Sequence, residues 1–328
     1  MPHILVAGKI HEAGLALLKA AAGVTFEYVE EVSAAYVALL PGADGLVIRT
    51  QQLTASSIAT SGRLQIVSRH GVGYDAVDVA ALNARGVPLT IVGDVNSQSV
   101  AEHTMMLMLA LAKRGAAHDS ATRSGDWAYR NRFDAFELSG KTLFLLGFGR
   151  IGRKVAALAR AFGMTVLAND TFVDDGVIRA AGVTPVHDVD AAYAVADVLS
   201  VHIPLAGPAA PVGARELALM KPTVLVINTA RGGLIDEAAL AVALAAGKLG
   251  GAGLDVFVTE PPVKDHPLLN SERVMLTPHT AGLSRESAMR MSVSSVQNVL
   301  DFFNGTLDPA LVVNRTSLSP AAARQLRS

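Results

Sequence analysis

Short apolar runs alternate with segments of helical periodicity along most of this chain. Between residue 4 and about residue 95 the runs predict five strands, at 4–7, 26–29, 45–48, 65–68 and 88–91. Connecting helices are expected near 11–22, 33–40, 54–62 and 76–85. Because strands that alternate with helices form a parallel sheet covered on both faces, the pattern predicts a doubly wound α/β region.

The alternation of short strands and helices stops near residue 99. The run Ser99-Val100-Ala101-Glu102 fits a capping box, with Ser99 as the N-cap of a long apolar helix. A second alternating region follows, with strands expected at 142–146, 164–168, 183–186, 197–203, 223–228, 251–255 and 273–277. A helix near 284–304, ended by Gly305, then returns the chain to the first region. The predicted domains are therefore 1–98 plus 285–316, an inserted domain at 99–284, and a C-terminal tail at 317–328.

A glycine-rich turn opens the inserted domain. The apolar run 142–146 ends in Gly147, Gly149 and Gly152 at the G-x-G-x-x-G spacing, and an Ala-rich helical segment follows. The next apolar run ends at Asp170. Strand, glycines, helix, strand and acid in this order are typical of a dinucleotide site, with phosphates at the helix N-terminus and the acid on a ribose. A structural glycine turn is the weaker alternative.

Composition narrows the class of protein. Of 328 residues, 51% are hydrophobic and 17% charged, as expected for a globular chain, and no apolar run approaches the roughly 18 residues of a membrane helix. The absence of cysteine excludes disulfides, thiolate catalysis and Cys-ligated zinc, and we expect no metal site. A net charge of −1 without a basic block argues against nucleic-acid and membrane partners. The chain enters a strand at once without a signal-like segment, so we expect a cytoplasmic protein.

Three residues just past predicted strand ends carry candidate chemistry: Arg231, Glu260 and His279. Ligands of open parallel sheets bind beyond the carboxyl ends of the strands, so the three can converge on one ligand. Arginine can hold a carboxylate through two hydrogen bonds. Histidine can exchange a carbinol proton near neutral pH, and a glutamate bonded to it would fix its tautomer and raise its pKa by roughly one to three units.

Each of these residues also has an ordinary explanation. Arg231 can brace a loop, Glu260 can be a solvated acid before two prolines, and His279 can cap the following helix. The combination of all three after a dinucleotide motif favours the chemical interpretation.

Several stretches together resemble the D-isomer-specific 2-hydroxyacid dehydrogenases over nearly the whole chain. They are "RHGVGYDAVD" (69–78), "VNSQSVAEHTMMLMLALAKR" (95–114), "LSGKTLFLLGFGRIGRKVA" (138–156), "LMKPTVLVINTARGGLIDEAAL" (219–240), "GAGLDVFVTEPP" (251–262) and "LTPHTAG" (276–282). The resemblance implies hydride transfer between a nicotinamide and C2 of a small D-2-hydroxy or 2-oxo acid. It assigns carboxylate binding to Arg231 and acid–base chemistry to the His279–Glu260 pair. An NAD(H)-sensing, corepressor-like binding protein on the same scaffold is the alternative.

The same resemblance implies the binding residues and the architecture. NAD contacts are expected from Gly147, Gly149, Arg150, Ile151, Gly152, Asp170, His202, Thr229, Ala230, Arg231, Asp255, His279 and Gly282. For His202 a strand-end histidine without a ligand is an equal alternative. Substrate contacts are expected from His70, Gly71, Val72, Gly73 and Arg231. The implied fold is α/β, with two doubly wound parallel-sheet domains: a Rossmann NAD-binding domain inserted into a flavodoxin-like substrate domain.

Four finer expectations concern single residues or short stretches. Asp170 has no basic residue directly after it, so its carboxylate would repel a 2′-phosphate and favour NAD over NADP. His70 stands beside the expected carboxylate loop and can hydrogen-bond a polar group of the substrate, such as a hydroxyl, phosphate or sulfonate. The stretch around Trp127 and Tyr129 is expected to pair two subunits in a homodimer, with a plain surface loop as the alternative, and His103 is expected to be structural.

Overall fold

The computed structural model describes residues 1–205, 207 and 209–318. The chain divides into two compact units. Unit 1 comprises residues 1–96 and the chain from 283 onward, and unit 2 comprises residues 97–282. The predicted domains placed these boundaries two residues later, at 99 and 285. Each unit is described below by itself.

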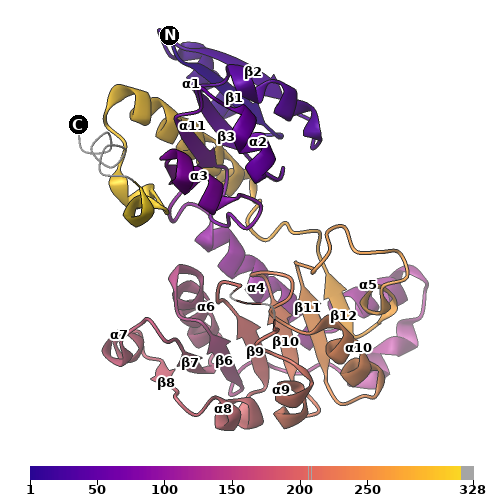
Figure 1. The fold of residues 1–328 in the computed structure, drawn as a ribbon. Helices are drawn as coiled ribbons and strands as arrows, with labels where there is room; N and C mark the ends of the chain where they lie inside the picture. Colours follow the sequence, from indigo (N-terminus) through magenta and orange to yellow (C-terminus); the bar gives the residue numbers. More distant parts are fainter. Residues whose placement is uncertain (206, 208, 319–328) are drawn as a thin grey trace. The chain divides into compact units, whose positions relative to one another are not determined.

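Unit 1 is built on a five-stranded parallel sheet with the order β2-β1-β3-β4-β5. Figure 1 labels three of its strands, β1, β2 and β3. Its strands are β1 (His3–Ala7), β2 (Thr25–Val29), β3 (Gly45–Ile48), β4 (Ile66–Arg69) and β5 (Leu89–Thr90). Its helices are α1 (Glu12–Ala20), α2 (Ala55–Thr60), α3 (Val79–Arg85) and α11 (Arg285–Asn304). Short 3-10 helices are η1 (Ala34–Ala38), η2 (Leu40–Gly42), η5 (Pro309–Leu311) and η6 (Arg315–Ser317). The order 2-1-3-4-5 is that of flavodoxin-like folds, as the family resemblance implied.

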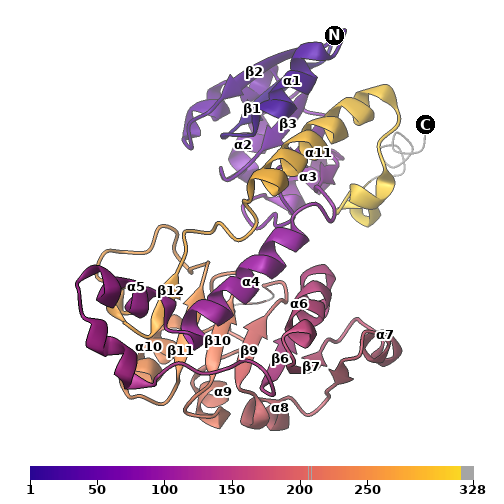
Figure 2. The same cartoon turned by 180° about the vertical axis from the view of Figure 1, so that it is seen from behind.

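Side chains of the unit 1 strands alternate between two buried faces. Leu5 and Leu46 pack in the core that α2 and α3 cover. Ile4 and Val47 pack in the core that includes side chains of α1 and α11. Helix α11, from the C-terminal part of the chain, thus completes the same hydrophobic core as the first strand, and it lies beside α1 in Figures 1 and 2.

Unit 2 is built on a seven-stranded parallel sheet with the order β12-β11-β10-β9-β6-β7-β8. Its strands are β6 (Thr142–Leu146), β7 (Thr165–Asn169), β8 (Thr184–Pro185), β9 (Val198–Val201), β10 (Leu225–Asn228), β11 (Gly251–Leu254) and β12 (Val274–Leu276). The first strand, β6, lies between β7 and β9, so the strand order reverses there. This is the Rossmann arrangement, which binds dinucleotides at the point of reversal.

Helices cover both faces of the unit 2 sheet. They are α4 (Ser97–Ala112), α5 (Gly115–Arg123), α6 (Arg150–Ala161), α7 (Asp175–Ala180), α8 (Val189–Val195), α9 (Ala214–Leu219) and α10 (Glu237–Ala245), with η3 (Trp127–Arg132) and η4 (Pro267–Asn270). Leu143 and Leu145 pack with side chains of α4 and α6. Phe144 and Leu146 pack on the opposite face with side chains of α8, α9 and α10. Figure 2 shows α4 and α6 together in front of the sheet.

Two expectations about helices are wrong. The expected helix at 33–40 is replaced by the two 3-10 helices η1 and η2, because Pro41 has no N–H to donate in the hydrogen bonds of one continuous α-helix. Ser99 is not an N-cap, since α4 begins at Ser97. Its hydroxyl donates instead to the carbonyl oxygen of Ala281 (2.7 Å). Glu102 accepts a hydrogen bond from Gln98, so neither half of the expected capping box forms.

The end of the chain agrees with the sequence as far as it is described. Ser284 caps α11 by accepting from the Ser287 N–H, and Gly305 ends the helix with φ of 72°. The expected tail, 317–328, lies outside the described residues from 319 onward.

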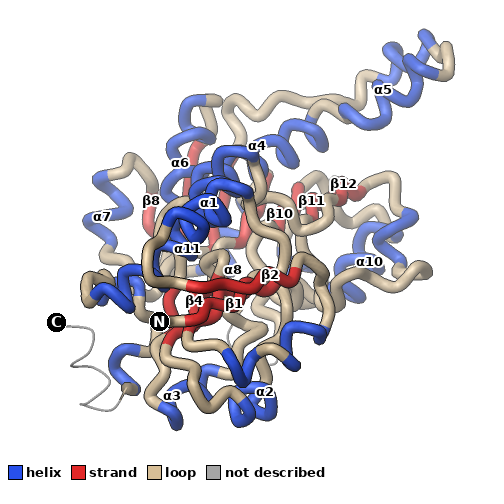
Figure 3. The backbone as a smooth tube through the Cα atoms, turned by 90° about the horizontal axis from the view of Figure 1, so that it is seen from above, coloured by secondary structure: helices blue, strands red, loops and turns tan. Residues whose placement is uncertain are grey.

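The segment after α4 was not predicted to be helical. It forms α5 and then η3, and Figure 3 shows α5 extending away from the strands of unit 2. Trp127 and Phe133 at this segment are 69% and 88% exposed. Over the described residues, the helices are all too short or too polar to span a bilayer.

Candidate active site

The expected site residues of unit 2 follow the carboxyl ends of neighbouring parallel strands. Gly147 follows β6, Asp170 follows β7 and His202 follows β9. Thr229, Ala230 and Arg231 follow β10, Asp255 follows β11, and His279 comes three residues after β12. The sheet therefore brings all of them to one edge, the edge at which open α/β sheets bind ligands.

The glycine turn after β6 has the geometry of a dinucleotide cradle. A Cβ atom on Gly147 would lie 2.6 Å from the carbonyl oxygen of His202, and one on Gly152 would lie 2.3 Å from that of Gly147. Both positions therefore require glycine. A Cβ on Gly149 would meet nothing within 4 Å, and this residue is the N-cap of α6 without a capping side chain. The turn leaves open space at a helix N-terminus, as a pyrophosphate requires.

Asp170 braces this turn and keeps accepting capacity. One carboxylate oxygen accepts from the Phe148 N–H (2.7 Å), and the other accepts from the N–H groups of Phe172 (2.8 Å) and Val173 (3.1 Å). An ionised carboxylate offers about four acceptor positions, so one remains for a ribose hydroxyl. The residues of the turn therefore fit a bound NAD.

Arg231 lies in a turn held by a residue that the sequence analysis missed. The Oδ1 atom of Asn228 accepts from the Ala230 N–H (3.0 Å), and its Nδ2 donates to the Arg231 carbonyl oxygen (2.8 Å). Asn228 is 2% exposed. A polar residue at the end of an otherwise apolar strand is the signal that could have identified it. The arginine Nη1 donates to the Ala230 carbonyl oxygen (2.6 Å).

His279 and Glu260 form the expected pair. The His279 Nδ1 lies 2.7 Å from the Glu260 Oε2, and Glu260 Oε1 accepts from the Phe257 N–H (3.0 Å). Burial raises the pKa of Glu260, but its hydrogen bonds from His279 and Phe257 and the charges of His279 and Arg231 outweigh burial and leave the pKa below 4.5. The carboxylate is therefore ionised near neutral pH. It can only accept, so Nδ1 carries the proton and Nε2 is the ring nitrogen that Glu260 does not engage.

Asp255 holds the loop that carries His279. This carboxylate is 1% exposed, and its oxygens accept from the N–H groups of Thr280 (2.8 Å) and Ala281 (2.9 Å). Its own carbonyl oxygen accepts from the His279 N–H (2.8 Å). His279 has a φ of 53°, which is uncommon for a residue with a side chain. Asp255 therefore fixes an unfavourable backbone conformation at the candidate proton carrier.

His202 is a buried neutral imidazole next to the glycine turn. Its Nε2 lies 2.9 Å from Ser200 Oγ, while its buried Nδ1 has no hydrogen-bond partner among the described residues. Burial lowers the pKa of His202 to about 4. The free ring nitrogen favours a ligand contact over the alternative of a strand-end histidine, because an unmet buried polar atom is costly.

The expected substrate residues of unit 1 follow β4. The His70 N–H donates to the Ile48 carbonyl oxygen (2.8 Å), which extends the pairing of β3 and β4 by one residue. His70 is 5% exposed, and neither ring nitrogen has a partner among the described residues. Gly71, Val72 and Gly73 come next, with Gly71 at φ of 150°. The side chain of His70 is thus buried and available to a ligand.

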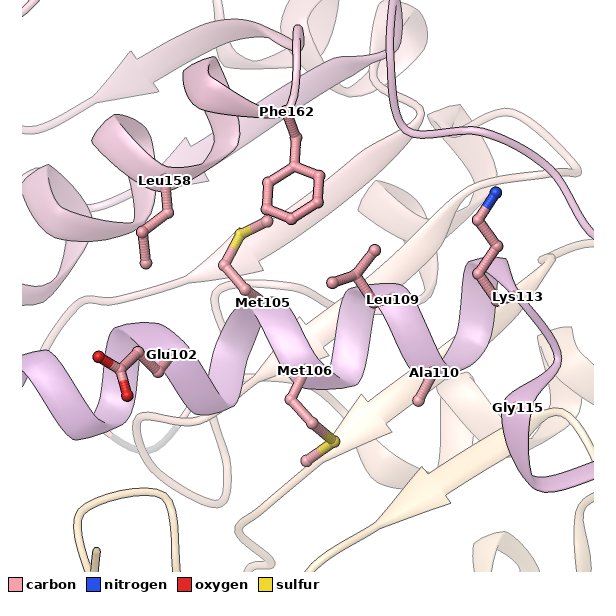
Figure 4. Close-up of a pocket in the computed structure, with 9 residues that line it drawn as sticks. All are labelled: Glu102, Met105, Met106, Leu109, Ala110, Lys113, Gly115, Leu158 and Phe162. Atoms are coloured by element: carbon pink, nitrogen blue, oxygen red, sulfur yellow. The ribbon is translucent and has the colours of Figure 1, made fainter. Parts of the chain in front are cut away.

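A separate apolar groove lies on the α4–α6 face of unit 2. It has a volume of about 540 Å³ and is lined by Glu102, Met105, Met106, Leu109, Ala110, Lys113, Gly115, Leu158 and Phe162. Figure 4 shows these residues along α4 and just after it, with Leu158 and Phe162 at the C-terminal end of α6. The lining includes none of the candidate catalytic residues, so we do not assign the reaction to this groove.

Comparison with known proteins agrees with this geometry. Residues 105–281, more than half of the chain, match the family described as D-isomer specific 2-hydroxyacid dehydrogenase, NAD binding domain. The D-3-phosphoglycerate dehydrogenase of Methanocaldococcus jannaschii is 39% identical over an alignment of 298 positions that covers 88% of this chain and 55% of that protein. The chain thus spans about half the length of the curated relatives it matches.

Solved structures are similar over nearly the whole chain. The TT0316 protein of Thermus thermophilus is 31% identical, with a TM-score of 0.87 over 94% of this chain and 98% of its own. A D-lactate dehydrogenase from Aquifex aeolicus, solved with NAD and lactic acid, is 29% identical, with a TM-score of 0.82 over 92% and 96% of the two chains. The chain therefore belongs to the D-isomer-specific 2-hydroxyacid dehydrogenase family, and the model that matches residues 105–281 describes the NAD-binding domain of that family.

Proposed function

We propose that this protein is an NAD-dependent dehydrogenase that interconverts a small D-2-hydroxy acid and its 2-oxo acid. The observation that carries the proposal is the His279–Glu260 pair, joined at 2.7 Å, in the same unit as the dinucleotide turn and at the same sheet edge. The positive charge of Arg231 also acts on the Glu260 carboxylate and lowers its pKa. Beyond the cofactor, this reaction needs a cation that binds the substrate carboxylate and an oriented group that gives and takes a proton. Arg231 and His279 can supply these two functions.

Each residue has a separate task in the proposed mechanism. NAD, when bound, supplies the hydride acceptor. Arg231 binds the substrate carboxylate through its planar guanidinium and so orients C2. The His279 Nε2 takes the carbinol proton in oxidation and returns it to the carbonyl oxygen in reduction. Glu260 keeps the Nδ1 proton in place and stabilises the charged imidazole while the proton is held.

The remaining binding residues belong to the same proposal. Gly147, Gly149, Arg150, Ile151 and Gly152 would hold the pyrophosphate. Asp170 would hold the adenosine ribose and disfavour a 2′-phosphate. His202, Thr229, Ala230, Asp255 and Gly282 would lie around the rest of the cofactor.

Residues of unit 1 would contact the substrate. We assign the domain made of 1–98 and 285–316 to substrate binding, with Gly71, Val72 and Gly73 on the carboxylate. A neutral His70 would hydrogen-bond a further polar group of the substrate. This assignment is supported by the two ring nitrogens, which have no hydrogen-bond partner among the described residues, because a buried polar atom without a partner is costly. If His70→Ala leaves the relative rates on 2-oxo acids with different side groups unchanged, His70 makes no such contact.

A panel of 2-oxo acids assayed with NADH and NADPH tests the function. We expect the wild type to reduce at least one short 2-oxo acid with NADH. His279→Ala should lose this activity, because a positioned acid–base group typically raises the rate by roughly 10²–10⁴-fold. Tight NADH binding without turnover of any panel member would instead indicate the NAD(H)-sensing alternative, which the similarity to dehydrogenases does not favour.

We further propose that the protein is a cytoplasmic homodimer. The support is the apolar surface of unit 2, which includes the groove of Figure 4 and the exposed side chains of Trp127 and Phe133. A second copy of the chain can cover such a surface. The cytoplasmic location is part of the proposal because the reaction needs NAD, which cells keep in their interior. Sedimentation should give a dimer for the wild type and a smaller species for Trp127→Ser combined with Phe133→Ser. A wild type that is monomeric at micromolar concentration would contradict the dimer.

A further inference from the structure

Three polar side chains on α4 bind the loops that carry the candidate catalytic residues. Ser99 Oγ donates to the Ala281 carbonyl oxygen (2.7 Å), and His103 Nε2 lies 2.9 Å from Thr277 Oγ1. Thr104 Oγ1 lies 2.9 Å from Thr229 Oγ1. The first two contacts hold the loop of His279, and the third holds the loop of Arg231. The two loops are therefore attached to the same helix through different residues.

The proton positions around Thr277 follow from its neighbours. Thr277 Oγ1 lies 2.6 Å from Asp255 Oδ1, and an ionised carboxylate can only accept. A threonine hydroxyl has one proton, so Thr277 donates to Asp255 and must accept from His103. The Nε2 of His103 therefore carries a proton. The opposite tautomer would turn the hydroxyl toward the imidazole and remove a donor from a carboxylate that is 1% exposed.

Asp255 connects the Thr277 hydroxyl to the backbone around His279. It holds the Thr280 and Ala281 N–H groups with its carboxylate and the His279 N–H with its carbonyl oxygen. His279 needs this support because its φ of 53° is unfavourable for a residue with a side chain. The contacts form one continuous path from helix α4 to the imidazole.

We propose that His103 is a positioning residue, whose Nε2–H orients the Thr277 hydroxyl toward Asp255 and thereby fixes the 277–281 loop and His279. The proposal rests on the proposed function for its kinetic readout. The side chain of His103 is 16% exposed, and its Nε2 lies 3.7 Å from Asp255 Oδ1, farther than from the Thr277 hydroxyl that it bonds. Burial lowers the pKa of His103 more than the nearby Asp255 raises it, so the ring stays neutral with a single proton near neutral pH.

Two variants of His103 separate the effect of its N–H donor from the effect of its size. His103→Gln keeps an N–H donor at about the position of Nε2, whereas His103→Met keeps the size and removes the donor. Met106→Leu, at a more exposed position of α4, is the matched control. We expect His103→Met to lower kcat by about 10–10²-fold, since small displacements of a reacting group cost that much. KM for the 2-oxo acid should change little, because the Arg231 loop is held through Thr104 and Asn228. His103→Gln should recover most of kcat.

Imidazole NMR of the ¹⁵N-histidine-labelled protein reads the proton position without turnover. We expect an Nε2–H signal for His103, and a shifted His279 signal in His103→Met but not in His103→Gln. An Nδ1–H tautomer, a wild-type kcat in His103→Met, or equal losses in both variants would overturn the proposal. If the wild type reduces no 2-oxo acid at all, the proposed function fails, and the two NMR measurements still decide the role of His103.

Discussion

Burial of the His70 imidazole should make unit 1 less stable in mild acid. His70 is 5% exposed, and its pKa is lowered from 6.5 to about 4, first by burial and then by the charges of Arg49 and Arg69. In the unfolded chain the same ring titrates near 6.5. Between the two values the unfolded state binds a proton that the folded state does not, so the free energy of unfolding decreases as the pH falls.

The size of the effect follows from the two pKa values. Each pKa unit of difference corresponds to about 1.4 kcal/mol. The contribution of His70 is complete above about pH 6.5 and is lost progressively toward about pH 4. Linkage gives a loss of about 1.4 kcal/mol by about pH 5.5 and about 3 kcal/mol near pH 4.

Urea unfolding at a series of pH values measures this loss. His70→Leu replaces the ring with an untitratable side chain of similar volume, so its free energy of unfolding should fall less steeply with acid than that of the wild type. His202→Leu is the matched comparison in unit 2, because burial lowers the pKa of His202 to about 4 as well. Parallel curves for the wild type and His70→Leu would show that the folded protein does not keep this imidazole neutral.

Four further substitutions test the site. Arg231→Ala should raise KM for the 2-oxo acid by about 10–10²-fold, the value of a hydrogen bond to a charged group, with NADH binding nearly unchanged; steady-state kinetics and NADH titration measure the two quantities. Glu260→Gln should lower turnover and move the pH profile of reduction toward acid, because the protonated imidazole loses its charged partner. Asp170→Ala should narrow the preference for NADH over NADPH in a cofactor competition assay. Gly152→Ala should destabilise unit 2 by about 1–3 kcal/mol in thermal unfolding, since the added Cβ lies 2.3 Å from a carbonyl oxygen.

The dinucleotide turn could be predicted because its determinants are local. Gly147 and Gly152 are required by contacts that the turn makes with itself and with the adjoining strand end. The alternation of apolar runs and helical segments likewise predicted both parallel sheets, since parallel strands that are buried on two faces are continuously apolar. The same reasoning placed Arg231, Glu260 and His279 at one edge, because each follows a strand of the same sheet.

Element boundaries depended on contacts that the local pattern does not contain. Ser99 followed by Glu102 has the spacing of a capping box, but the hydroxyl finds its acceptor in a loop 182 residues away. Helix α5 was missed because its polar sequence has only one buried residue, Ala121, and thus little apolar periodicity. In both cases tertiary contacts, or their absence, decided the outcome.

The role of His103 shows most clearly what local pattern reasoning cannot reach. On α4 it is one of several polar residues in the first half of the helix, and the sequence supports only a structural assignment. Its partner Thr277 lies 174 residues further along the chain and was not singled out. What makes the pair informative is the third member, Asp255, because a buried carboxylate dictates the direction of every hydrogen bond that reaches it. A sequence can name the residues at a strand end, but the direction in which protons are shared among them follows only from their distances.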